Sequence, residues 1–258
     1  MCSIRGSDTR PSSIILTHGH FDHVGSVLQL SDEWAVPVYC HHLETPYLTG
    51  KSSYPPPDPT VGGGLMSLMS FTFPKKPINV QNHLRELPDG GTVPDLHHWQ
   101  WLHTPGHAPG HISLYRERDG VLVAGDAFVT TNQHSALSVM TQKVELCGPP
   151  MYFTPDWGSA ASSVKKLDAL QPEVLATGHG RTMYGAEARK ALHKLTREFW
   201  QKVMPDDGRY VKEPALFNED GVAYLPPNRM NRYFLAAVGV TAFAVVIEIM
   251  LYRKRKAA

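Results

Sequence analysis

Short apolar runs alternate along the chain with stretches whose apolar residues recur at helical spacing. The segments that we predict to be regular strands or helices are Ile14–Thr17, Val24–Leu30, Val36–Cys40, Trp99–His103, Ile112–Arg116, Val121–Ala124, Val164–Leu170, Val174–Thr177 and Ala186–Val203. Strands that alternate with helices are typical of layered α/β domains. The pattern therefore predicts an α/β fold.

The alternation breaks between Thr45 and Asp95. This segment contains Pro55-Pro56-Pro57, a run of three glycines from Gly62, and a stretch rich in Met and Phe from Leu65 to Phe73. Clusters of Pro and Gly disfavour regular elements, and long loops inside compact domains often cover a binding site. We predict an apolar loop or lid over residues 45–95, and an apolar lid favours a small, partly apolar substrate.

A second break runs from Pro205 to Asn228 and is rich in Pro, Asp and Gly. Residues of these types favour turns and linkers over packed elements. We interpret residues 1–204 as one globular domain and residues 205–232 as a linker.

The last apolar run extends from Tyr233 to Tyr252, with Thr241 and Glu248 as its polar exceptions, and four basic residues follow it. About 20 helical residues can cross a bilayer core of about 30 Å. We predict a transmembrane helix over residues 233–252 and a basic tail over residues 253–258; an amphipathic or buried helix is the alternative. Because no signal-like segment opens the sequence, we expect a single-pass membrane protein whose globular domain is cytoplasmic.

The overall charge is close to zero, since 25 Lys and Arg residues face 24 Asp and Glu residues. Such a balance creates no field that would attract a polyanion, so we expect no nucleic-acid partner. The three cysteines, Cys2, Cys40 and Cys147, have no CxxC spacing. The 14 histidines are the unusual feature, because imidazole is the commonest metal ligand among side chains.

Four of the candidate metal ligands lie together directly after the run Ile14–Thr17. They are the His and Asp residues of His18-Gly19-His20-Phe21-Asp22-His23. Side chains two apart in an extended chain face the same way, so His18 and His20 can bind one ion. Asp22 and His23, at the start of the following helix, can then turn toward another ion.

Three more candidate ligands follow other apolar runs. His107 comes after Trp99–His103, Asp126 after Val121–Ala124, and His179 after Val174–Thr177. In open α/β sheets, sites form in the crevice beyond the carboxyl ends of the strands, so one fold can bring all of these groups together. Adjacent glycines allow the backbone to turn sharply at these points.

The motifs HGHFDH, TPGHAPGH, AGD and TGHG resemble, in this order over Ile14 to Gly180, the successive signatures of the metallo-β-lactamase superfamily. The resemblance implies a four-layer αββα sandwich with two metal ions. It also implies that Asp126 bridges the ions, with the other ligands divided into two sets: His18, His20 and His107 for one ion, and Asp22, His23 and His179 for the other.

Two divalent ions that share a carboxylate and a water molecule lower the pKa of that water and provide a hydroxide nucleophile. We therefore expect a metal-dependent hydrolase of a small ester, thioester or lactone, with Asp22 as the catalytic residue that orients the hydroxide and relays its proton. Zinc is the expected metal, and iron or manganese accept similar ligands.

Several other residues are candidates for lesser roles. His134, Tyr152 and Tyr184 are candidate proton donors or substrate contacts, and His111 is expected to orient a neighbouring ligand rather than bind metal. The histidines away from these motifs are expected to be structural.

Two features depart from the resemblance. A zinc β-lactamase of the commonest type carries Cys where Asp126 stands, which argues against that activity. Only 17 residues precede His18, whereas members of the superfamily usually have several strands there, so we expect an N-terminally shortened sheet, with a homodimer as one way to cover its edge.

Two alternative functions stay open from the sequence. One is a membrane-tethered scaffold that binds metal without turnover, and the other is a phosphodiesterase or nuclease of the same superfamily.

Overall fold

The computed structural model describes residues 10–62 and 64–228. The larger of its two main sheets has five strands in the order β4-β5-β6-β7-β8. These strands are β4 (Gln100–His103), β5 (Ile112–Arg116), β6 (Val121–Gly125), β7 (Val174–Thr177) and β8 (Met183–Tyr184). β6 and β7 are parallel, and the other neighbouring pairs are antiparallel.

The smaller sheet has three parallel strands in the order β1-β2-β3, which are β1 (Ile14–Ile15), β2 (Val38–Cys40) and β3 (Leu84–Glu86). The backbone N–H of Ile112 donates to the carbonyl of Thr17 over 2.9 Å. This bond joins the chain after β1 to strand β5, so the two sheets meet where the predicted metal-binding motif begins.

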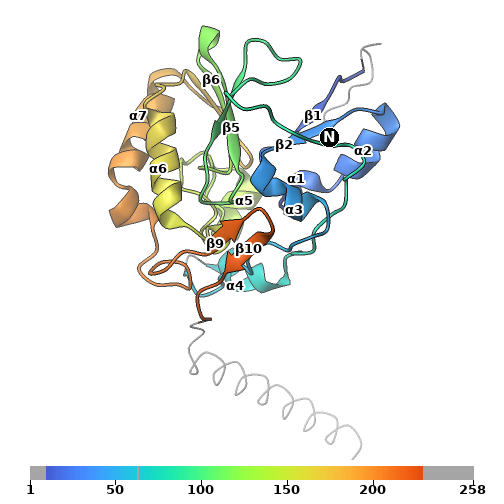
Figure 1. The fold of residues 1–258 in the computed structure, drawn as a ribbon. Helices are drawn as coiled ribbons and strands as arrows, with labels where there is room; N and C mark the ends of the chain where they lie inside the picture. The colour runs from blue at the N-terminus through green and yellow to red at the C-terminus, as the bar shows by residue number, and fades with distance from the viewer. Residues whose placement is uncertain (1–9, 63, 229–258) are drawn as a thin grey trace, which may run out of the picture. The chain divides into compact units, whose positions relative to one another are not determined.

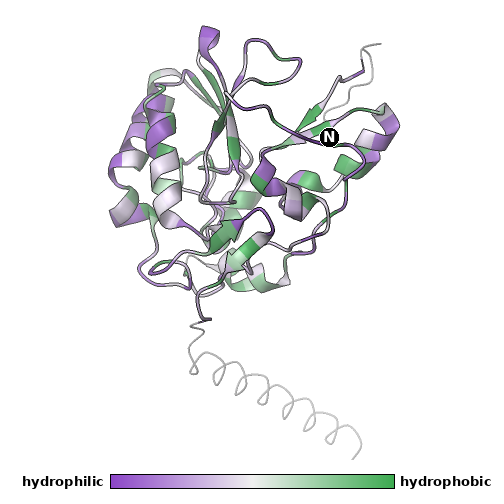
Figure 2. Cartoon of the chain, viewed as in Figure 1, coloured by the Kyte–Doolittle hydropathy of each residue, from purple (hydrophilic) through white to green (hydrophobic). Residues whose placement is uncertain are grey.

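Two helices cover the outer face of the larger sheet, α6 (Trp157–Asp168) and α7 (Gly185–Arg197), and a short π-helix, η5 (Phe199–Val203), follows α7. Their apolar faces form one buried cluster with the sheet, which includes Leu122, Leu175, Val164 and Leu192. The outer surface of α7 is mainly hydrophilic (Figure 2). The burial of the apolar stripes is what holds these helices on the sheet.

Two shorter helices, α1 (Phe21–Val24) and α2 (Val27–Trp34), cover the smaller sheet. Their buried residues form a second apolar cluster with the strands: Leu16, Val24, Val27, Val38, Cys40, Leu48 and Val80. Helices thus lie outside both sheets (Figure 1), and the predicted α/β class is confirmed.

The structure differs from the predicted lid over residues 45–95. This segment forms helices α3 (Thr45–Leu48) and α4 (Leu65–Met69), and it also contributes strand β3, which pairs with β2. Tyr47 and Tyr54, predicted in the lid, are 1% and 8% exposed. The segment therefore combines packed elements with loop: Tyr47 and Tyr54 are buried, whereas Leu65 and Phe71 are 54% and 64% exposed.

The predicted linker is wrong for residues 205–226, which belong to the same compact unit as the sheets. Tyr210 and Ala215 lie in the main apolar cluster. The strands β9 (Leu216–Asn218) and β10 (Gly221–Tyr224) form an antiparallel hairpin, and Val222 N donates to Ser52 Oγ over 3.4 Å. The Pro, Asp and Gly residues form turns within the fold rather than a spacer.

Within residues 10–62 and 64–228, none of the helices is both long and apolar enough to cross a membrane. The predicted span over residues 233–252 and the basic tail over residues 253–258 lie outside the described residues. Membrane anchoring, cytoplasmic placement and the homodimer therefore stay predictions from the sequence.

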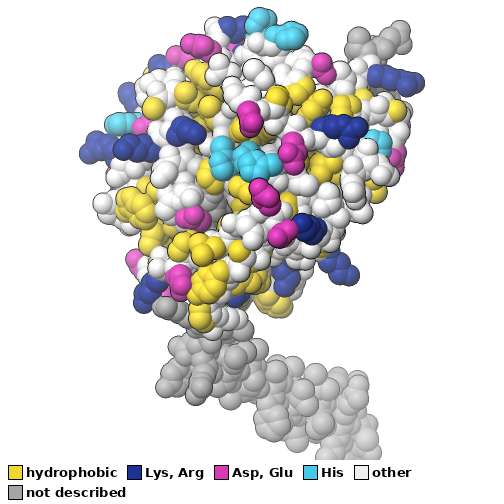
Figure 3. Space-filling model, viewed as in Figure 1, with side chains coloured by type: hydrophobic (Ala, Val, Ile, Leu, Met, Phe, Trp, Pro, Cys, Tyr) yellow, Lys and Arg dark blue, Asp and Glu magenta, His cyan; other side chains and the backbone are white. Residues whose placement is uncertain are grey.

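The surface carries charges of both signs. On the face shown in Figure 3, Lys and Arg side chains are interspersed with Asp and Glu side chains, with hydrophobic groups between them. The view agrees with the net charge of +1 and shows no continuous cationic tract on this face.

Candidate metal centre

The carboxyl ends of three strands of the larger sheet meet at one edge. Because β5 is antiparallel to both β4 and β6, those two strands run in the same direction, and β7 is parallel to β6. The loops that leave this edge carry His107, Asp126 and His179, and the chain after β1 brings His18 to the same place. The topology alone therefore brings together groups that are distant in sequence.

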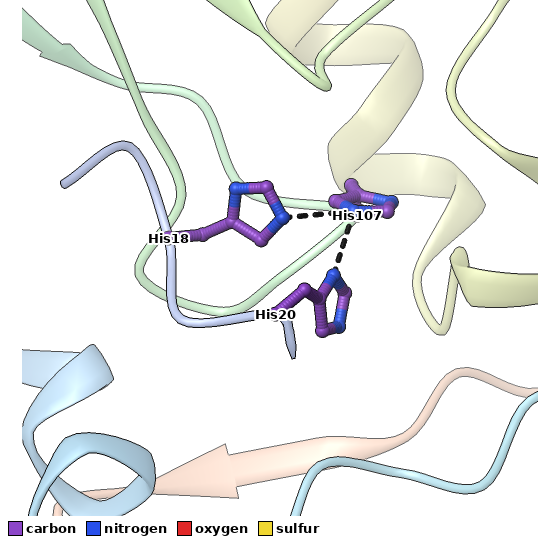
Figure 4. A group of neighbouring side chains, drawn as sticks. All are labelled: His18, His20 and His107. Carbon is purple, nitrogen blue, oxygen red and sulfur yellow. Dashed lines mark hydrogen bonds between the residues drawn. The ribbon is translucent and has the colours of Figure 1, made fainter. Parts of the chain in front are cut away.

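The first group of candidate ligands consists of His18, His20 and His107. His107 Nε2 lies 2.8 Å from His20 Nδ1 and 3.2 Å from His18 Nε2. Figure 4 shows His18 and His20 on one loop with their rings directed toward His107 on another. Zn–N bonds of 2.0–2.1 Å in a tetrahedral site separate ligand nitrogens by about 3.3 Å. The three nitrogens are therefore spaced as ligands of one ion would be.

These three imidazoles are buried, with 0–6% of each residue exposed. Burial lowers the pKa of His18 and of His107 well below the ordinary value and lowers the pKa of His20 to about 4. Neutral imidazoles keep a lone pair on one nitrogen, which is the form that binds metal.

The second group consists of Asp22, His23 and His179, and it is more open to solvent. His179 Nε2 lies 3.2 Å from Asp22 Oδ2, and His23 Nε2 lies 3.9 Å from the same oxygen. Burial raises the pKa of Asp22, but its hydrogen bond with His179 lowers that pKa below the ordinary value. Burial likewise disfavours charge on His179, yet hydrogen bonds with Asp126 and Asp22 raise its pKa to about 10. Without metal, a proton on His179 is therefore stabilised by the carboxylates of Asp126 and Asp22, which could equally stabilise a metal cation.

Asp126 joins the two groups. Its Oδ2 lies 3.5 Å from Nε2 of His107 in the first group, and 3.5 Å and 3.2 Å from Nε2 of His23 and His179 in the second. Asp126 is 2% exposed, and neither its Oδ1 nor Nε2 of His23 has a hydrogen-bond partner among the described residues. Buried polar atoms without partners are costly, so these atoms fit metal ions as their partners.

His111 is buried and holds Asp126 in place. The backbone N–H of Asp126 donates to His111 Nε2 over 2.9 Å, which puts the ring proton on Nδ1. That nitrogen lies 2.8 Å from Thr104 Oγ1, and a chain of hydroxyls continues through Ser113 to the carbonyl of Ala124. His111 thus orients the backbone of a candidate ligand, the role expected for it.

Gly178 lies where no larger residue fits. A Cβ at this position would overlap Asp126 Oδ1 and would lie 2.9 Å from His23 Cε1. We expect Gly178→Ala to displace Asp126 and His23 and to reduce the metal content of the dialysed protein to one ion per chain or fewer. Elemental analysis measures this, with Gly158→Ala in α6 as the control, because a Cβ at Gly158 meets nothing closer than 3.5 Å. Equal metal content in both variants would contradict the expectation.

The three predicted substrate contacts differ in position. Tyr152 is 4% exposed and lines a small pocket with His20 and His107, so it lies beside the centre. His134 lines a separate cavity of about 570 Å³ with residues of α7. Tyr184 is 65% exposed and pairs with Val174 at the start of β7, the end opposite His179. The structure therefore does not bring Tyr184 to the candidate ligands, because β8 runs antiparallel to β7 and Tyr184 lies beside the start of that strand.

Aromatic side chains lie beside the centre, among them Phe153, which the sequence analysis missed, and Phe73 of the predicted lid. The Phe153 ring lies 5.0 Å from the His20 ring, 6.5 Å from Phe21 and 6.0 Å from Phe73. Phe153 belongs to a short 3-10 helix, η4 (Met151–Phe153), far from the metal motifs in sequence. An aromatic cluster beside polar ligands is typical of a site for a small, partly apolar molecule.

A family model of the metallo-beta-lactamase superfamily matches residues 2–179. The chain belongs to the metallo-beta-lactamase superfamily. Superfamily membership and the relatives named as probable metallo-hydrolases make it a metallo-hydrolase, and the His and Asp cluster indicates a divalent metal.

Three proteins illustrate how this superfamily member relates to others. It is 50% identical over 190 residues to the probable metallo-hydrolase YflN of Bacillus subtilis (strain 168), covering 74% of this chain and 72% of YflN. It is 29% identical over 113 residues to hydroxyacylglutathione hydrolase GloC of Haemophilus influenzae, covering 44% of this chain and 48% of GloC. The superfamily protein ST1585 from Sulfolobus tokodaii shares the fold at a TM-score of 0.51 and 20% identity, covering 77% of this chain and 71% of that one.

Proposed function

We propose that this enzyme hydrolyses a small ester, thioester or lactone at a centre of two metal ions. The observation that carries the proposal is the position of Asp126, whose single oxygen Oδ2 lies within 3.5 Å of histidines from both ligand groups. A buried carboxylate between two sets of neutral or potentially neutral imidazoles has the chemistry of a bridging ligand.

The assignment of ligands follows the two groups. His18, His20 and His107 would hold one ion, Asp22, His23 and His179 the other, and Asp126 would contact both. Zinc suits this donor set, and iron or manganese are the alternatives. When bound, the ions would lower the pKa of a water molecule and polarise the carbonyl of the substrate.

Asp22 is the residue of this set best placed to act on water. Its side chain is 35% exposed, whereas that of Asp126 is 2% exposed, so Asp22 faces the open side of the centre. Its lowered pKa keeps it a carboxylate at neutral pH, and a carboxylate can accept a proton from an attacking water. Asp22 would therefore both orient the water and take its proton.

The surroundings of the centre favour a substrate that is partly apolar. Phe21, Phe73 and Phe153 give it an aromatic wall, and burial raises the pKa of the Tyr152 hydroxyl, so that this group stays protonated as a hydrogen-bond donor. GloC, by its name, acts on a hydroxyacylglutathione, which is a thioester, and this supports including thioesters in the proposed class.

The two alternatives have less support. A scaffold without turnover does not need the open, ionised Asp22, and relatives of this chain are named as hydrolases. A nuclease needs a cationic surface for its polyanionic substrate, and the face in Figure 3 mixes both signs of charge.

Metal analysis combined with a substrate panel tests the proposal. The full chain, stripped by a chelator and reloaded with zinc, iron or manganese, is assayed against an aryl ester, a thioester, a lactone and a phosphodiester. We expect two ions per chain and metal-dependent hydrolysis of at least one carbonyl substrate. Hydrolysis of the phosphodiester alone, or two bound ions with no turnover, would overturn the proposal in favour of one of the alternatives.

A further inference from the structure

Glu44 is a fully buried carboxylate outside the predicted metal motifs. It lies in the 3-10 helix η1 (His42–Glu44), directly after β2, and 0% of the residue is exposed. No ion pair with a Lys, Arg or His side chain includes it in the part of the chain that the structure describes. A buried charge without a cationic partner is costly, so its position calls for compensation by other groups.

Three hydrogen-bond donors supply that compensation. Glu44 Oε1 accepts the backbone N–H of Gly110 over 2.8 Å, and Glu44 Oε2 accepts the backbone N–H of Gly19 over 2.9 Å. The Tyr54 hydroxyl also donates to Oε2. One side chain thus bonds to two loops that are about 90 residues apart in sequence.

Both loops carry ligands of the first group. Gly19 lies between His18 and His20, and Gly110 lies three residues after His107. No hydrogen bond joins Glu44 to Asp22, His23 or His179 among the described residues. The carboxylate therefore sets the distance between the two backbone segments that form the first ligand group. In the second group, His179 lies on a different loop, to which Glu44 makes no hydrogen bond among the described residues.

The two glycines permit this close approach. A Cβ at Gly110 would lie 2.8 Å from Glu44 Cγ, and a Cβ at Gly19 would lie 2.8 Å from the Tyr54 hydroxyl. Both distances are too short for real contacts, so only glycine lets Glu44 and Tyr54 reach the backbone at these points. Gly19 of the HGHFDH motif and Gly110 of the TPGHAPGH motif are thus required for the contacts of Glu44 and Tyr54.

Tyr54 completes the arrangement. Its hydroxyl accepts the Gly19 N–H over 2.9 Å, and its ring lies 4.3 Å from the ring of His20. Tyr47 stacks on Tyr54 at 4.0 Å from the other side. The phenol is therefore fixed in place as a donor to Glu44 and as a wall against a candidate ligand.

We propose that Glu44 is a positioning residue for the first metal ion: by binding Gly19 and Gly110 at once, it holds His18, His20 and His107 at ligand spacing. This inference rests on the proposed two-metal centre. Its consequence is selective, because all three ligands of the first ion lie on the two loops that Glu44 joins, whereas His179 of the second group lies on a third loop. Loss of the carboxylate should therefore weaken binding of the first ion more than binding of the second.

The variant Glu44→Gln tests this, because glutamine has the same shape but presents an NH2 group either to the Gly110 N–H or to the donors of Gly19 and Tyr54. The full chain is stripped of metal and titrated with Co²⁺, whose visible absorption is more intense in a tetrahedral three-nitrogen site than in a site of higher coordination. We expect the affinity for the first ion to fall about 10–100-fold, as is usual when a group that orients metal ligands is lost. The second binding step should change much less. Tyr54→Phe, which removes one donor, should show a smaller effect of the same kind.

The control is Glu86→Gln on β3, an exposed carboxylate that accepts a hydrogen bond from Thr45 Oγ1. Near-ultraviolet circular dichroism and the thermal midpoint of the metal-free variants report whether the fold is kept. The inference fails if Glu44→Gln binds both ions with the parent's constants and spectrum. It also fails if both steps weaken equally, since Glu44 would then support the whole fold. A parent chain that binds fewer than two ions would instead refute the proposed function.

Discussion

Replacement of Asp22 by Asn is expected to reduce kcat for any substrate of the enzyme by about 10²–10⁴-fold, the range that a positioned acid–base group contributes. The amide keeps the size of the side chain but cannot accept a proton from water. It also loses the charge that faces His179 at 3.2 Å. Because the Asp22 side chain is 35% exposed and not part of an apolar cluster, the fold should survive.

Steady-state kinetics and metal content are measured on the same preparations. Asp32→Asn is the matched control, since Asp32 is a carboxylate on α2 whose partner is His83 at 2.7 Å, and it should leave kcat unchanged. If Asp22→Asn keeps the parent's kcat while holding two ions, the proton acceptor is another group. If it holds only one ion, reloading at high metal concentration separates the loss of a ligand from the loss of a base.

The convergence of the candidate ligands could be predicted because each one is marked locally. His107, Asp126 and His179 each follow an apolar run and a glycine, and the direction of the strands decides that their loops meet. Placing a ligand at the carboxyl end of a strand requires no knowledge of how side chains pack. For the same reason the α/β class and most strand positions could be read from the sequence.

The supporting residues could not be predicted in this way. Glu44 has the sequence appearance of a surface carboxylate, and its burial depends on Gly19, Gly110 and Tyr54, which come from three separate segments. Phe153 likewise reaches His20 only through the path of the chain after β6. The sequence held one signal for Glu44. Gly19 and Gly110, near the histidine ligands, leave room for a side chain from another segment.

Local composition is a poor guide to structure at the C-terminal side of the domain. Pro, Asp and Gly between residues 205 and 226 indicated a linker, yet Tyr210 donates its hydroxyl hydrogen bond to Pro56 O over 2.7 Å and packs in the core. Arg209 Nε donates to Pro226 O over 2.8 Å. The contact of Tyr210 with Pro56 joins residues about 150 positions apart, and local composition carries no information about such a contact.

The metal-free chain is expected to unfold as the pH falls from 7 toward 5. In this range its buried imidazoles stay neutral in the folded state but take up protons in the unfolded state. Burial lowers the pKa of His20 to about 4 and of His41 and His111 to about 3, and lowers the pKa of His18 and His107 well below the ordinary value. In the unfolded chain these groups bind protons below about pH 6.5. The contribution of these neutral imidazoles to the free energy of unfolding is thus fully present above pH 6.5. It is lost as the pH falls toward the folded-state pKa values.

Each such group lowers the free energy of unfolding by about 2 kcal/mol at pH 5 when its folded-state pKa is near 4. His20, His41 and His111 together cost on the order of 6 kcal/mol, which is comparable to the stability of an ordinary domain. His179 acts in the opposite sense: its pKa of about 10 is raised, so its contribution is full below pH 6.5 and is lost as the pH rises through 10. Between pH 7.5 and pH 5 it adds only about 1 kcal/mol, too little to offset the loss.

Urea unfolding of the chelator-treated protein between pH 7.5 and pH 5 measures the effect as a fall in the free energy of unfolding. His134→Gln is the variant that tests the cause, since burial lowers the pKa of His134 to about 4 and it lies outside the candidate ligands. Removing it should reduce the fall between pH 7.5 and pH 5 by about 1–2 kcal/mol. A fall of the same size in parent and variant, or a metal-free protein equally stable at both pH values, would mean that these imidazoles are not held neutral by the fold. Because ligands must be deprotonated to bind metal, bound ions should shift the unfolding to lower pH.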